Sequence, residues 1–100
     1  MKPTIGRIVH YKLSQNDADQ INRRRDFAAS VSANAGFPTH LGNHAEAGQV
    51  FPAQIVRVFD PTGDYGTCNL QVSLDGNDTF WATSRKTGDE EGAWSWPPRA

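Results

Sequence analysis

The fold of this chain is decided by the stretch TCNLQVSLDGNDTFWATS, residues 67–84. From Cys68 to Leu74 every second residue is apolar and the residues between them are polar, which is the period of a strand with one buried face. The run DGND at residues 75–78 is typical of a tight hairpin turn. Residues 79–84 favour a returning strand, so the stretch predicts an antiparallel hairpin.

Further strands are predicted on both sides of this hairpin. Runs of β-branched and apolar residues indicate strands at 5–12, 49–59 and 93–96. The connections are expected to be a variable loop at about 36–49, a turn at 60–64 and a polar loop at 85–92. The predicted order is therefore one strand, one long connection, and four short strands joined by turns and loops.

The long connection after the first strand contains a predicted helix at about residues 15–35. Ser14 is placed to cap this helix, with Asp17 three residues on, and Gly36 is placed to end it. Its apolar stripe is thin and consists of Ala18, Ile21, Ala28, Ser32 and Ala35, with Phe27 and Val31 at the edge. We therefore expect the helix to lie on the outside of a β fold.

Five short strands with one long first connection predict a mainly β fold with one helix, a small five-stranded SH3-like barrel with the helix inserted after the first strand. The 100 residues are expected to form a single domain, residues 1–100. The segment FPAQIVRV at 51–58, followed by LDG at 74–76, resembles the Tudor and PWWP branch of SH3-like barrels. This resemblance implies the same fold.

Composition excludes several classes of function. The net charge of −1 lacks the basic surplus typical of nucleic-acid binding, so nucleic acid is not an expected partner. No apolar run approaches the roughly 20 residues of a membrane span, and no signal peptide is recognisable. The single Cys68 fits a reducing cytoplasm. A hydrophobic share of 37% indicates either long solvated loops or stability gained by forming a homo-oligomer.

The residue types needed for catalysis are not arranged in a recognisable site. His40 and His44 are four residues apart, but they lie in a predicted loop and no further ligand completes a tetrahedral metal site. Cys68 alternates with apolar residues, so it is expected to be a small buried hydrophobe. The sequence therefore predicts no enzyme, no metal and no cofactor.

Three consecutive arginines, residues 23–25, lie in the predicted helix, and two interpretations of them remain open. In the first, the stems of Arg24 and Arg25 cover apolar surface while the guanidinium groups reach water, where Asp17, Asp19 and Asp26 are available to pair with the arginines. In the second, these guanidinium groups project past the barrel toward an anion such as a phosphate.

Two tryptophans, Trp94 and Trp96, lie on the last predicted strand and would share one face. Because the first and last strands of a small barrel meet, we expect Arg7 to lie near one of them. The pair is either part of the core or an aromatic platform for a planar ligand. We expect one indole to seal the barrel and the other to contact a partner. The candidate ligand-binding residues are Arg7, His10, Arg24, Arg25, Trp81, Thr83, Ser84, Trp94, Trp96 and Arg99.

Four sequence blocks resemble a family of small proteins encoded by tailed phages and prophages. The blocks are KPTIGRIVHY at 2–11, NRRR at 22–25, LDGND at 74–78 and WSWPPR at 94–99. They extend over the whole chain apart from the variable loop. The resemblance implies a phage origin and a place in the cytoplasm of an infected bacterial host, but no particular activity.

Two functions are compatible with these observations. In the first, the chain is an anti-defence binding protein, a sponge that sequesters a cyclic nucleotide or an ADP-ribose-type immune signal without catalysis, in pockets built by a homo-oligomer. In the second, it is a virion or assembly accessory protein that uses the barrel as a protein-interaction module. The first is suggested by the arginine, tryptophan, serine and threonine residues, by the absence of a catalytic motif and by a core that is thin for a monomer.

Overall fold

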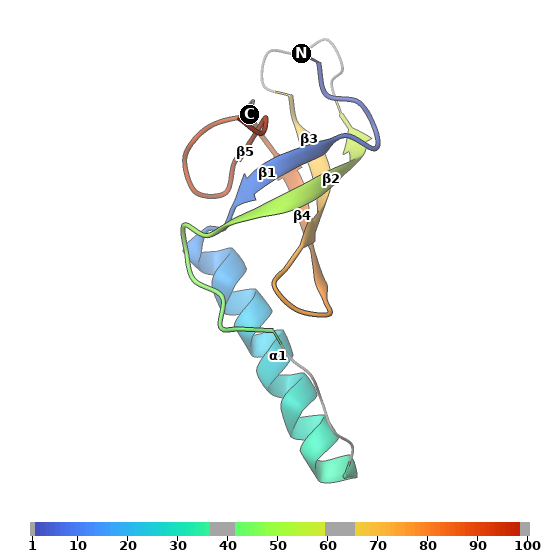
Figure 1. Ribbon diagram of the computed structural model, residues 1–100, viewed down its shortest axis with the longest axis vertical. Coiled ribbons are helices and arrows are strands. Elements are labelled where there is room, and N and C mark those ends of the chain that lie inside the picture. The colour runs from blue at the N-terminus through green and yellow to red at the C-terminus, as the bar shows by residue number, and fades with distance from the viewer. Residues whose placement is uncertain (1, 37–41, 60–65, 99–100) are drawn as a thin grey trace.

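The structure is a computed structural model that describes residues 2–36, 42–59 and 66–98. The described residues form β1 (Ile8–Lys12), α1 (Gln15–Ala35), β2 (Val50–Val58), β3 (Cys68–Ser73), β4 (Thr79–Arg85) and β5 (Trp94–Ser95). The strands make one antiparallel sheet in the order β4-β3-β2-β1-β5 (Figure 1). The mainly β fold with one helix after the first strand is thus confirmed.

The strands predicted at 5–12, 49–59 and 93–96 are all shorter in the structure, and the second loses only one residue at each end. β1 begins at Ile8 rather than Ile5, because residues 5 and 6 form a turn. β5 contains only Trp94 and Ser95, and the two prolines that soon follow have no N–H group to continue a ladder. The turn expected at residues 60–64 lies outside the described part of the chain.

β2 lies in the middle of the sheet although it contains Pro52, a residue normally confined to edges. The pairing register explains this position. Pro52 is opposite His10 of β1, whereas the pairing with β3 starts one residue later, at Ala53 and Val72. The missing N–H of Pro52 therefore removes no hydrogen bond from the β2–β3 ladder.

Two irregularities bend the sheet at the level of Asn69. The register of β2 against β3 shifts between Ile55 and Arg57, and that of β3 against β4 shifts between Cys68 and Leu70. A bulge of this kind adds one residue to a strand, which bends the strand and increases its twist. The Asn69 amide oxygen accepts hydrogen bonds from the Thr83 hydroxyl (2.9 Å) and the Ser84 backbone N–H (2.8 Å) at this bend.

The core lies on one face of the sheet and is completed by the first turns of α1. Alternate residues of the four longer strands point into it, as the period of the 67–84 stretch predicts. Its fully buried members include Val9, Tyr11, Leu13, Ala18, Ile55, Cys68, Leu70, Val72, Ala82 and Trp94. Cys68 is fully buried, as the sequence predicts, and this burial raises the pKa of its thiol.

The helix has the ends that the sequence predicts. The Ser14 hydroxyl accepts a bond from the Asp17 N–H (3.1 Å), and the Asp17 carboxylate accepts one from the Ser14 N–H (3.0 Å), which makes a capping box. Gly36 ends the helix in the left-handed conformation at φ 76°. These short-range contacts are sufficient to define both boundaries.

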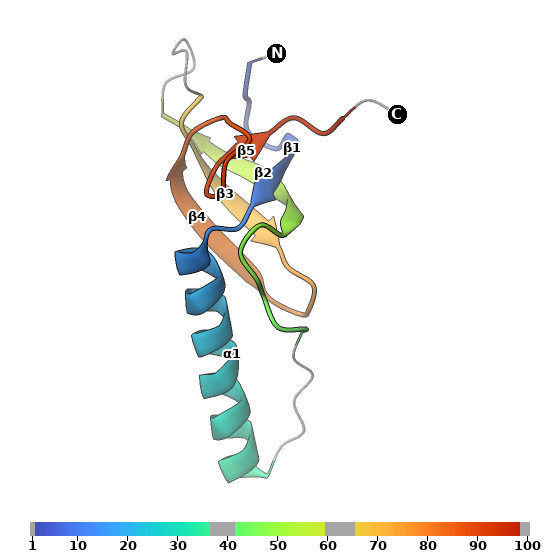
Figure 2. The same ribbon diagram turned by 90° about the vertical axis from the view of Figure 1, so that its left-hand side faces the viewer.

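Beyond Arg25 the helix projects from the fold. Its buried residues, Asp17, Ala18, Ile21 and Arg25, all lie in the first half. The second half extends away from the sheet in both ribbon views (Figures 1 and 2), and the molecule measures 50 × 26 × 21 Å. The first half of the helix thus lies against the outside of the β fold, as expected, and the second half makes no buried contact with it. The described part of the chain contains no helix that could cross a membrane.

Candidate functional site

The candidate ligand-binding residues do not form one site. Arg99 lies outside the described residues, and the others fall into three groups in different parts of the fold. One group is at the β1–β5 pair, a second is on α1 beside the turn between β3 and β4, and the third is on β4.

The first group combines an arginine with both tryptophans. The guanidinium carbon of Arg7 lies 5.5 Å from the centroid of the Trp96 ring, a cation–π distance. The Trp96 and Trp94 rings meet edge to face, with centroids 5.3 Å apart and planes at 88°. In the pairing of β1 with β5, His10 is opposite Ser95, the residue between the two tryptophans. The expected proximity of Arg7 to the tryptophans is confirmed.

Trp94 is core and cannot be a platform for a ligand. It is 0% exposed, and its indole N–H donates to the carbonyl oxygen of Gly66 (3.0 Å). Trp96 lies just beyond the end of β5 and is half-buried against the core. The two indoles therefore do not form a shared open surface. Trp96, with Arg7 over its ring, is the one that solvent reaches.

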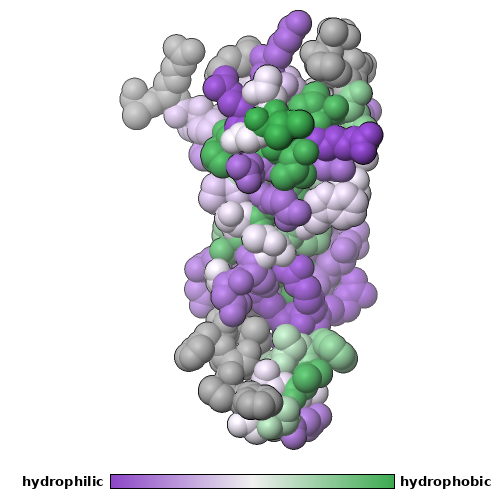
Figure 3. Space-filling view, turned by 90° about the vertical axis from the view of Figure 1, so that its right-hand side faces the viewer, coloured by the Kyte–Doolittle hydropathy of each residue, from purple (hydrophilic) through white to green (hydrophobic). Residues whose placement is uncertain are grey.

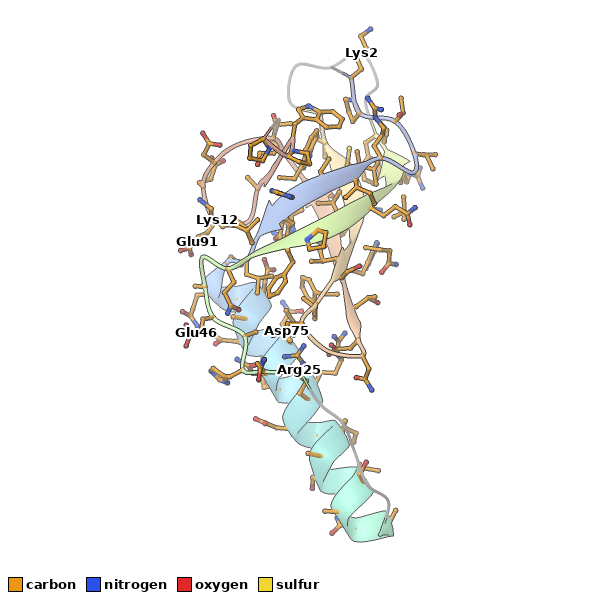
Figure 4. The ribbon with its side chains drawn as sticks, viewed as in Figure 1. Lys2, Lys12, Arg25, Glu46, Asp75 and Glu91 are labelled. Atoms are coloured by element: carbon orange, nitrogen blue, oxygen red, sulfur yellow. The ribbon has the colours of Figure 1, made fainter. Side chains whose placement is uncertain are left out.

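The second group is a network that we call the arginine joint, made of Arg25, Asp78, Asn43 and Asp75. The Arg25 guanidinium donates two bonds to the Asp78 carboxylate, from Nε to Oδ2 (3.0 Å) and from Nη2 to Oδ1 (2.9 Å). It also donates to the backbone carbonyl of Asn43, whose amide donates to Asp75 (2.7 Å). Figure 4 shows Arg25 of α1 near Asp75 of the turn between β3 and β4.

Two glycines allow the backbones to close around this joint. A Cβ atom at Gly42 would collide with the carbonyl oxygen of Asp75 and would lie 2.8 Å from Arg25 Nη2. A Cβ atom at Gly76 would lie 2.8 Å from the Cα atom of Gly42. Only residues without side chains fit at this crossing, so Gly42 and Gly76 are needed for packing.

The arginine joint gives the helix arginines a different partner from those considered in the sequence, and it closes Arg25, but not Arg24, to an external anion. Arg24 binds Asp78 at 3.1 Å as well, so neither residue pairs with an acid of its own helix in these contacts. The side chain of Arg25 is only 7% exposed, which leaves its guanidinium closed to an external anion. The bidentate hydrogen bond to Arg25 is the main reason that the pKa of Asp78 is lowered. These arginines attach the helix to the hairpin.

The third group is on the outer face of β4. Trp81 is 55% exposed and is opposite Gln71 of β3. Thr83 and Ser84 follow it, but they are used in the bend around Asn69, and Ser84 has a positive φ of 57°. Of this group, Trp81 is the side chain available for a partner.

A buried network that sequence reasoning missed attaches the start of the helix to the core. Asp17 is 0% exposed and accepts bonds from the Tyr11 hydroxyl (2.5 Å) and from Arg85 Nη2 (2.9 Å). The Arg85 guanidinium also lies over the Tyr11 ring, 5.7 Å from its centroid. Burial and the Asp17 carboxylate both raise the pKa of Tyr11, so the phenol remains protonated in the folded protein.

The sequence contained one signal for this network. Asp17 is predicted as a capping residue, and the same carboxylate that caps the helix also accepts bonds from Tyr11 and Arg85. Tyr11 and Arg85 could not be assigned from spacing, because they are distant in sequence and meet only in the folded chain.

The surface groove between α1 and residues 44–47 offers no chemistry of its own. It is open, has a volume of about 720 Å³, and is lined by polar residues that include Asp19, Asp26, His44 and Glu46. Within the described ranges, no group of three or more His, Cys, Asp or Glu residues could hold a metal ion. His40 lies outside those ranges.

Comparison of the chain with protein-family models, with curated proteins and with solved structures finds no match.

Proposed function

We propose that this protein is a non-catalytic interaction module whose projecting helix binds a partner protein. The single observation that carries this proposal is the exposure of two large apolar side chains on the second half of α1. Phe27 is 72% exposed and Val31 is 50% exposed. They are four residues apart, so they lie on one face of the helix, as the anchors of a helix that binds in a groove do.

The charges around these anchors define the partner. On the helical wheel Arg23 and Arg24 lie on either side of the line through Phe27 and Val31. Both arginines are exposed, although Arg24 also contacts Asp78. Figure 3 shows hydrophobic residues at the end of the helix, below a more polar zone. The complementary partner is an apolar groove with an acidic rim.

The scaffold in this proposal is a small SH3-like barrel. The bridge between Thr87 and Trp94, which brings the chain after β4 beside β5, supports closure at that end, while Thr79–Ala82 of β4 remains an open edge. The arginine joint supports a rigid base for the helix. In the phage setting that the sequence blocks suggest, the partner is a protein of the virion or of its assembly.

The test compares two substitutions that add the same charge to different faces of the helix. Phe27→Glu places a carboxylate in the contact, so recovery of an identified virion or assembly protein from infected cells should fall at least about tenfold. Ala33→Glu, on the far side of the exposed helix, should recover it as the unchanged protein does. Equal recovery with both variants would reject the proposal. Melting temperatures should stay close, because both positions are exposed.

Sequestration of a nucleotide-type immune signal is a second candidate, and the contact between Arg7 and Trp96 favours it. An indole and a guanidinium are the groups that hold a base and a phosphate. Calorimetry against cyclic di- and trinucleotides and cyclic ADP-ribose isomers tests it. Binding should be lost in Trp96→Ala and kept in Trp81→Ala, and the absence of heat with every ligand rejects this function.

A further inference from the structure

The sheet has two edges, and one of them is already covered by the chain itself. The backbone N–H of Trp94 in β5 donates to the carbonyl of Lys86 (3.1 Å), and its carbonyl accepts from the N–H of Gly88 (2.9 Å). Both backbone groups of Trp94 therefore point to residues 86–88, on the side away from β1. The outer side of β5 has no room for another strand there.

The other edge, β4, is paired only on its inner side among the described strands. It has seven residues and pairs with β3, so alternate N–H and C=O groups point away from the sheet. Residues 79–84 contain no charge, no proline and no glycine, which are the features that normally keep an edge from pairing. The bulge opposite Asn69 begins only at Thr83, so Thr79–Ala82 is regular.

The exposed side chain of Trp81 lies in this regular part of the edge. It is 55% exposed on the outer face, whereas Phe80 and Ala82 on either side of it are buried. A large aromatic ring at a free edge gains by packing against a ring on a neighbouring strand.

We infer that β4 pairs antiparallel with β4 of a second copy of this chain, which joins two sheets across a two-fold axis. Free N–H and C=O groups in a row are a template for another extended strand. A β5 edge of a second copy is not available, because residues 86–88 cover it. A β4 edge is available, and a two-fold axis near Trp81 brings this indole beside its counterpart. The inference is independent of the helix surface proposed above.

Sedimentation equilibrium of the full chain measures this association. Wild-type protein is expected to be dimeric, and Trp81→Lys should raise the dimer dissociation constant at least about tenfold, because two like charges then meet across the axis. Gln71→Lys is the matched control, since Gln71 is exposed on the same face directly opposite Trp81 but one strand away from the edge. This control should dimerise like the wild type.

Hydrogen exchange of the wild-type protein gives a readout that needs no substitution. The outward amides of Thr79–Ala82 should be protected at high concentration and exchange faster on dilution. A protein that is monomeric at every concentration would overturn the inference. A dimer that Phe27→Glu dissociates and Trp81→Lys does not would also overturn it. If Trp81→Lys unfolds the chain, protection of these amides decides the matter alone.

Discussion

At the scale of single residues, burial separates two tryptophans that are indistinguishable in sequence. Trp94 and Trp96 are two positions apart, and each has apolar or small neighbours. Trp94 fills the core and donates to Gly66, whereas Trp96 stays half-buried under Arg7. Its place in the core makes Trp94 a determinant of stability rather than of ligand binding.

Replacing Trp94 should therefore destabilise the whole domain. Trp94→Ala removes a fully buried indole and leaves the Gly66 carbonyl without its donor, so the free energy of unfolding should fall by about 3–5 kcal/mol. Trp81→Ala, at an exposed position, should change it by less than about 1 kcal/mol when measured below the dimer dissociation constant. Denaturant unfolding measures both. Equal losses would mean that Trp94 is not the core residue described.

At the scale of elements, the arginine joint connects the helix, the loop at residues 42–45 and the hairpin between β3 and β4. Arg25 contacts Asp78 of the hairpin and Asn43 of the loop. Because the helix buries little apolar surface beyond Ile21, this polar contact sets where the helix leaves the sheet. Both ion pairs that hold the helix here depend on the single carboxylate of Asp78, so the contact is sensitive to pH.

The pH dependence of stability follows from Asp78. Its pKa is lowered in the folded state, so the folded protein binds this proton more weakly than the unfolded chain does. The stabilisation is complete well above the usual value of 3.8 and is lost as the pH falls through the lowered folded value. Asp78→Asn should lower the free energy of unfolding at neutral pH by about 1–3 kcal/mol. The further fall of this free energy as the pH is lowered should then be smaller than in the wild type.

Urea unfolding measured from neutral to acidic pH checks this expectation. Asp26→Asn is the control, since it removes a carboxylate from an exposed position on the same helix. In this control the free energy of unfolding should fall with decreasing pH as much as it does in the wild type. A wild-type decline that persists unchanged in Asp78→Asn would show that other carboxylates cause it.

At the scale of the whole molecule, the surfaces proposed for partners lie on different elements. The projecting half of α1 presents Phe27 and Val31, and the open edge of the sheet presents Trp81. A dimer formed through β4 would carry two such helices, so one assembly could bind a partner at two points. The elongated shape follows from the helix, which buries residues only in its first half.

The sequence by itself determined the features that depend on neighbouring residues. The capping box between Ser14 and Asp17 and the C-terminal Gly36 set the helix boundaries within a few residues of chain. The alternation from Cys68 to Leu74 identified the β3 strand and its buried face. These features are local, so a pattern of spacing is enough to predict them.

Only the tertiary structure decided which side chains meet. Arg25 and Asp78 are 53 residues apart, and nothing in the spacing of the arginines points to the hairpin. The burial of Trp94 and the exposure of Trp81 likewise depend on how the sheet bends and on which edge the segment at 86–88 covers. Contacts between distant segments depend on the path of the whole chain, and the local pattern does not contain that path.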